Sequence, residues 1–313
     1  MKKSTKISAD KDLAKIQFKE MNKKFYSNYM SSYYSLKLQN LLYIISHSKD
    51  YQNQINGCEV EIGRLKTTFG GVGTEEVKEY AKLEIANMYF HCLETFIRLF
   101  IAHGSKTLCP WLEMSRLNQR KYKKALEKLS KGDFNWINEE LDENEITLLV
   151  ITGSAEAQGS FTKEDIEGLK TWIIFAAEQL LKTYEYNSFK HGLTVYTNTN
   201  GFKFMQKDEI KLEKHGECLQ FLSTKEKDDR YVWVENTVFI SYDSKATIVW
   251  IFMNLIKNII NVGNYYYVDK SKGCDFEFIP NHKLTPRYVL AEDKQMTVEG
   301  ISMELLYKKS NNR

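Results

Sequence analysis

The spacing of apolar residues changes at Gly192, and this change constrains the fold of the 313-residue chain more than any other feature. Before Gly192, apolar residues recur every three or four positions, the period of a helix with one buried face. After it, the segments 193–197, 202–206, 210–223 and 230–242 alternate apolar and polar residues, as strands do. We therefore predict an α+β fold: a helical domain over 1–192, then a β-rich region over 193–313 with a small antiparallel sheet, a covering helix and an irregular C-terminal tail.

Local signals place the elements along the chain. Apolar periodicity predicts one or two helices over 10–49, and further helices over 74–103, 110–132, 162–192 and 245–262. The glycine-rich segment 51–73 is predicted to be a connection, and 134–157 a shorter helix or a loop. Three to five strands are expected between 193 and 242, and one more near 303–306.

Composition excludes several classes of protein. The net charge is only +3, so any basic surface must be a local patch. The five cysteines are widely spaced and form no CxxC pair, which argues against a disulfide framework or a zinc site. No run of about 18 uncharged apolar residues is present, and the lysines at the N-terminus precede no apolar segment. We expect no membrane contact, no signal peptide and a cytoplasmic protein.

The helix predicted over 74–103 is apolar on most of its surface but carries a polar seam. Steps of three and four residues place its members on one narrow stripe, because such positions share a helix face. In one interpretation, Glu94 and Arg98 pair with each other and the stripe meets solvent. In the other, the stripe faces a cleft shared with a second polar helix, an arrangement typical of acid–base sites. The seam consists of Glu84, Asn87, His91, Glu94 and Arg98.

Two helix ends carry similar histidine motifs. The first runs from Arg98 through four residues to His103 and Gly104, and the second from Asn187 through three residues to His191 and Gly192. This pattern resembles the HEPN superfamily, helical bundles marked by an arginine, four to six residues, and a histidine. The first motif has Leu99 where a polar residue is usual, and the second has Tyr186 in the place of the arginine.

The resemblance implies a metal-independent ribonuclease that works as a homodimer, of the kind found in phage defence and toxin-like systems. Arg98 would hold the scissile phosphate and His103 would transfer a proton. Asn187 and His191 would form a supporting pair. Arg98 and His103 lie about 140° apart on a helix of 3.6 residues per turn, so they converge only if the helix unwinds near Gly104. The alternative role of each histidine is to interact with free carbonyls at a helix end.

Basic residues crowd the helix that follows the first motif. Such a helix can follow a phosphate backbone, and the alternative is an ordinary solvent-exposed face. The residues that we expect to contact nucleic acid are Arg116, Arg120, Lys121 and Lys124.

Other motifs argue against bound groups. The glycines before Thr74 follow no clear strand and lack the lysine of a phosphate loop. A di-metal bundle needs Glu-x-x-His, whereas this chain has His91-x-x-Glu94. We expect no metal and no cofactor. The predicted function is an RNA-cleaving HEPN-like enzyme, and the alternative is a non-catalytic HEPN-like module that binds a protein or a nucleic acid.

Overall fold

The structure is a computed structural model that describes residues 13–157, 161–190, 194–198, 201–206, 209–228, 230–274, 276, 278–291 and 300–305. His191 and Gly192 of the second histidine motif lie outside the described residues. The helices in the described part of the chain are α1 (Lys15–Asn28), α2 (Tyr33–Ser46), α3 (Ser48–Ile55), α4 (Thr74–Gly104), α5 (Pro110–Arg116), α6 (Gln119–Leu129), α7 (Glu143–Thr152), α8 (Lys163–Leu181), α9 (Thr183–Lys190), α10 (Tyr242–Tyr267), the 3₁₀ turn η3 (Lys270–Lys272) and α11 (Pro286–Ala291).

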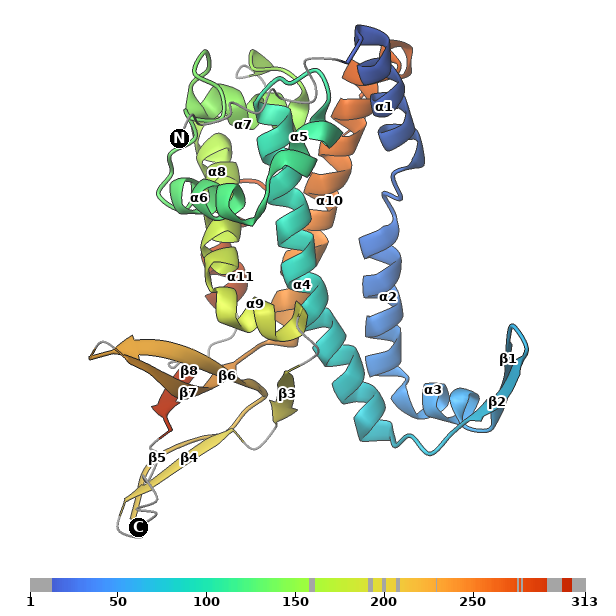
Figure 1. Ribbon diagram of the computed structural model, residues 1–313, viewed down its shortest axis with the longest axis vertical. Coiled ribbons are helices and arrows are strands. Elements are labelled where there is room, and N and C mark those ends of the chain that lie inside the picture. Colours follow the sequence, from blue (N-terminus) through green and yellow to red (C-terminus); the bar gives the residue numbers. More distant parts are fainter. Residues whose placement is uncertain are drawn as a thin grey trace, which may run out of the picture. The chain divides into compact units, whose positions relative to one another are not determined.

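All strand pairs in the described residues are antiparallel. A four-stranded sheet has the order β3-β6-β7-β8, with the long β6–β7 hairpin at its centre (Figure 1). Two separate hairpins, β1–β2 and β4–β5, complete the strands. The predicted α+β class is therefore confirmed. The strands are β1 (Cys58–Ile62), β2 (Leu65–Phe69), β3 (Val195–Asn198), β4 (Phe202–Gln206), β5 (Glu209–Lys214), β6 (Cys218–Lys227), β7 (Arg230–Phe239) and β8 (Gly300–Glu304).

Two predictions of local structure were wrong. The segment 51–73 is not a plain connection, because it holds the end of α3 and the β1–β2 hairpin. Gly63 takes a φ of +61° at the first central position of the two-residue hairpin turn, where glycine is favoured. The single helix predicted over 110–132 is two helices. Asn118 separates them, and its side chain caps α6 by accepting a hydrogen bond from the Lys121 backbone N–H at 3.1 Å.

The chain divides into two compact units, each composed of three segments of sequence. The first unit comprises 1–33, 92–181 and 251–286, and the second comprises 34–91, 182–250 and 287–313. A boundary within α4 and another within α10 mean that both long helices contribute residues to both units.

An aromatic cluster forms the core of the first unit. Phe96 packs edge-to-face against Phe252 at 4.9 Å between ring centroids, and Phe252 packs against Trp172 at 5.7 Å. All three side chains are fully buried. The Trp172 indole N–H donates to the Leu284 carbonyl at 2.9 Å, so the polar atom of this buried ring is satisfied. The core joins α4, α8 and α10 with the segment that follows α10.

The second unit has its own core. Phe90 of α4 stacks on Tyr186 of α9 at 5.1 Å, and α9 packs against β6 and β3. Leu219 and Phe221 of β6 are buried. α9 is thus the helix that covers one face of the sheet.

The long helix α10 is apolar and long enough to cross a membrane by composition alone. Of its most apolar window, 67% is buried in the structure. A core helix of a folded domain has this same character, because it contacts protein on most sides.

Candidate functional site

His103, the predicted proton-transfer residue, lies in the interior of the first unit with 5% of its surface exposed. Its Nε2 atom forms a hydrogen bond of 2.9 Å with the hydroxyl of Tyr26, which lies 77 residues earlier in the chain. The rings of Tyr26 and Tyr267 both meet the imidazole edge-to-face, at 5.9 and 6.1 Å. Burial lowers the pKa of His103 to about 3, so the ring is neutral at physiological pH.

A glycine makes this arrangement possible. Tyr26 stacks on Tyr267 of α10 at 5.8 Å between centroids, with an interplanar angle of 2°. A Cβ at Gly263, one turn earlier in α10, would lie 2.1 Å from the Tyr26 ring. Only a residue without a side chain lets the ring approach so closely. Burial also raises the pKa of Tyr267 to about 12, so its hydroxyl stays protonated.

Arg98, the predicted phosphate ligand, is held by three partners within the first unit. Its Nε and Nη2 atoms both lie 2.9 Å from the Glu94 carboxylate, and its Nη1 atom donates to the Leu117 carbonyl at 2.9 Å. The guanidinium also lies 4.3 Å from the ring centroid of Tyr122. The ion pair that the sequence predicted between Glu94 and Arg98 is present. These contacts neutralise and immobilise the guanidinium.

Arg98 and His103 do not share a partner in the described residues. Helix α4 continues through Gly104 without unwinding, so the two side chains keep the angular separation of about 140° expected on a regular helix. The two side chains would converge only if the helix unwound near Gly104, and it does not. His103 has a structural environment: a buried, neutral ring in a hydrogen bond with a phenol.

The second motif contributes one described site residue. Asn187 is exposed on α9, in the second unit. Tyr186, which stands where the arginine of the motif belongs, is 5% exposed and stacks on Phe90. Tyr186 therefore serves the core of the second unit.

The rest of the polar seam is occupied by local contacts. Glu84 pairs with Lys37 of α2 at 2.7 Å. His91 is exposed, and its backbone carbonyl accepts from the Tyr34 hydroxyl at 3.1 Å, while Asn87 is half-buried. Glu84, Glu94 and Arg98 of the seam are thus held by ion pairs, Glu84 with Lys37 and Glu94 with Arg98.

Helix α6 carries the strongest local charge in the described chain. Its buried face consists of Tyr122, Ala125, Leu126 and Leu129. Its opposite face is exposed, and within the described residues Arg120, Lys121, Lys123 and Lys124 form no ion pair. Lys128 is 3.8 Å from Asp133, and Glu127 is the one acidic residue of the helix. We call the set Arg120, Lys121, Lys123, Lys124 and Lys128 the α6 basic surface.

A groove of about 330 Å³ runs beside this surface. Lys121, Lys124, Lys128 and the half-buried Trp136 are among the residues that line it. Lys128 lies 5.5 Å from the Trp136 ring centroid. Of the predicted nucleic-acid ligands, Lys121 and Lys124 therefore lie together and Arg120 lies on the same exposed helix. Arg116 lies on α5, where it pairs with Glu113 at 3.1 Å.

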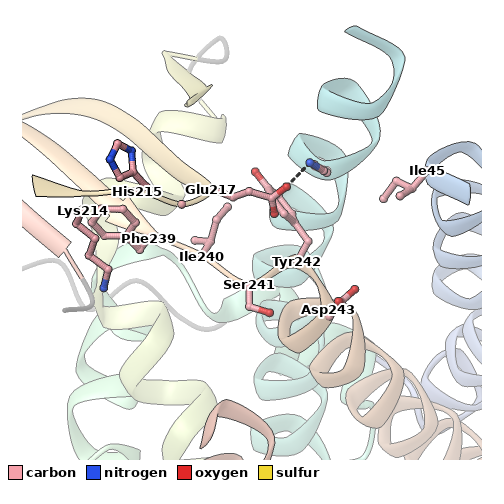
Figure 2. A pocket seen from close by; sticks show the side chains of 11 residues that line it. Ile45, Lys214, His215, Glu217, Phe239, Ile240, Ser241, Tyr242 and Asp243 are labelled. Carbon is pink, nitrogen blue, oxygen red and sulfur yellow. Dashed lines mark hydrogen bonds and ion pairs between the residues drawn. The ribbon is translucent and has the colours of Figure 1, made fainter. Parts of the chain in front are cut away.

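The second unit has a separate polar cavity of about 470 Å³ beside the first turn of α10 (Figure 2). Lys82 forms ion pairs there with Glu217 and Glu79, and the dashed line in Figure 2 marks the pair with Glu217. The buried ring of Tyr242 lies beneath the Lys82 ammonium, 5.6 Å from it. Because the lysine is already paired with two carboxylates, its ammonium has no uncompensated positive charge for an anionic ligand. Sequence reasoning missed it, since its members come from distant segments.

No protein-family model, curated protein or solved structure matches this chain. The resemblance to the HEPN superfamily therefore stays a prediction that rests on the histidine motifs alone.

Proposed function

We propose that this protein binds single-stranded RNA through the α6 basic surface, as a non-catalytic module. The observation that carries the proposal is the cluster of four cationic side chains on one exposed helix face that form no ion pair within the described residues. Like charges held close together on a helix destabilise it. A bound polyanion relieves that repulsion, and the release of its counterions favours association.

The groove beside α6 adds a second feature that suits RNA. Trp136 offers an aromatic face at the edge of the lysine cluster, and bases of a single strand stack on such faces. The one carboxylate among the groove residues, Glu113, is neutralised by Arg116. A strand could thus place phosphates along Lys121, Lys124 and Lys128 while one base contacts Trp136.

The environments of Arg98 and His103 support binding without cleavage. A general acid or base must reach the reacting atoms and change protonation near the working pH. His103 is buried with a pKa of about 3, and Arg98 is paired with Glu94. Ribonuclease activity remains the prediction made from the sequence motif, and the same experiment tests it.

The test is fluorescence anisotropy with a labelled 12-nucleotide RNA. We expect the double variant Lys121→Glu/Lys124→Glu to bind at least about tenfold more weakly than the unmodified protein, because it reverses two charges that face the groove. The matched control is Lys23→Glu/Lys24→Glu, two exposed lysines on α1. Equal affinity of both double variants for RNA would refute the proposal. Tighter binding of DNA of the same sequence would overturn the assignment to RNA.

Cleavage is measured on the same labelled RNA by gel electrophoresis with a chelator present. We expect intact RNA at every time point. Metal-independent cleavage that His103→Ala abolishes would refute the non-catalytic assignment and restore the ribonuclease.

A further inference from the structure

A second cavity in the first unit has the features of a small-ligand site. It measures about 350 Å³ and lies between α1 and the C-terminal end of α10, which are neighbours in Figure 1. Phe18 of α1 and Tyr266 and Tyr267 of α10 are among the residues that line it. Its volume is at the lower end of the range of pockets that bind small molecules.

The residues of α1 that line the cavity follow one helix face. Lys15, Phe18, Lys19 and Asn22 are spaced three, four and seven positions apart, which places them on one stripe. Lys270, just after α10, adds a third ammonium group at the rim. Within the described residues, none of these three lysines forms an ion pair, and none of the residues lining the cavity is acidic. The cavity therefore carries uncompensated positive charge.

A buried amide at the cavity lacks a hydrogen-bond donor. Asn22 is 3% exposed, and its Nδ2 atom donates to the Leu108 carbonyl at 2.8 Å. Its Oδ1 atom is buried and accepts no hydrogen bond. Leaving a buried acceptor unpaired costs on the order of 1–3 kcal/mol, so buried acceptors normally have a partner. Because the atom is covered, a ligand N–H group would reach it after a side-chain movement at the cavity wall.

We propose that this cavity binds a nucleoside monophosphate. Its base would stack against Phe18 and the tyrosine rings, and an amino or imino group of the base would donate to Asn22 Oδ1. The phosphate would contact Lys15, Lys19 and Lys270 through charge-assisted hydrogen bonds. Aromatic walls, an unpaired acceptor and excess positive charge in one cavity match an aromatic heterocycle that carries an anion. The proposal is independent of RNA binding by α6.

Isothermal titration calorimetry with AMP, GMP, CMP and UMP tests the proposal. We expect at least one of them to bind with a Kd below about 1 mM, and inorganic phosphate to bind more weakly. Phe18→Ala removes a stacking surface and Lys19→Ala removes a cation, and each should weaken binding by about tenfold. Asn22→Ala should weaken mononucleotide binding as well. Lys23 is an exposed lysine of α1 outside the cavity, so Lys23→Ala should have no effect.

Three results would overturn the proposal. The first is the absence of binding heat with all four mononucleotides at a ligand concentration of about 1 mM, the weakest Kd expected. The second is an equal affinity for inorganic phosphate. The third is unchanged binding by both Phe18→Ala and Lys19→Ala. Circular dichroism establishes that each variant is folded before titration. The variant Lys121→Glu/Lys124→Glu should bind mononucleotides normally, so a failure of the RNA proposal is distinguishable from a failure of this one.

Discussion

The buried His103 predicts a specific dependence of stability on pH. In the folded protein burial lowers its pKa to about 3, whereas an unfolded chain leaves histidine near about 6.5. Below pH 6.5 the unfolded state therefore binds a proton that the folded state does not, and unfolding becomes more favourable as the pH falls towards 3. The stability is fully present above about pH 6.5. Between pH 7 and pH 5, this one residue should remove about 2 kcal/mol from the free energy of unfolding.

Urea denaturation of the unmodified protein and of His103→Gln at both pH values isolates this contribution. Other groups that titrate between pH 5 and 7 contribute equally to both proteins, so the comparison removes them. We expect His103→Gln to be less stable at pH 7, because it changes a buried contact, but to lose about 2 kcal/mol less on acidification. The matched control is His47→Gln, at an exposed histidine. An identical pH dependence in His103→Gln would refute the burial of a neutral imidazole.

Three further outcomes follow from individual contacts. Arg98→Ala should lower the free energy of unfolding by about 2–4 kcal/mol, measured in urea, because it removes the cation that is paired with the half-buried Glu94 carboxylate. Gly263→Ala should cost about 1–3 kcal/mol, despite the better helix propensity of alanine, because its methyl group would clash with the Tyr26 ring. Hydrogen bonds from Thr162 and, to a smaller extent, from His282 lower the pKa of Asp165 to about 2. The ionised carboxylate therefore stabilises the folded protein above its unfolded pKa, and this stabilisation is lost as the pH falls through about 2. NMR titration of His282→Ala should show the pKa of Asp165 moving up towards its ordinary value.

The first histidine motif illustrates how a sequence pattern and a tertiary environment can differ. Arg98, His103 and Gly104 occupy the spacing that the HEPN resemblance requires. What surrounds them is set by Tyr26 and Tyr122, neither of which belongs to the motif. No periodicity in the sequence marks either tyrosine as the partner of a motif residue. Only the packing of α1 and α6 against α4 brings these rings to the histidine and the arginine.

In the β-rich region, too, the sequence pattern predicted the local structure but not the tertiary contacts. Alternation of apolar and polar residues was enough to predict the strands, because side chains of a strand point alternately to its two faces. Alternation does not identify strand partners. The pairing of β7 with β8, whose residues lie about 65 positions apart, and the separation of β4 and β5 into their own hairpin depend on contacts between distant segments.

By itself, the sequence determined the class of the protein and the position of most helices and strands, because hydrophobic period and capping are local properties. The Asp142 cap of α7 is an example: its side chain and that of Glu145 bond reciprocally to the backbone within four residues. Tertiary structure alone decided the state of the candidate site. Whether His103 is a proton carrier or a buried neutral ring depends on burial, and its hydrogen-bond partner Tyr26 lies 77 positions away in the chain. Burial is a property of the packed interior rather than of any one segment.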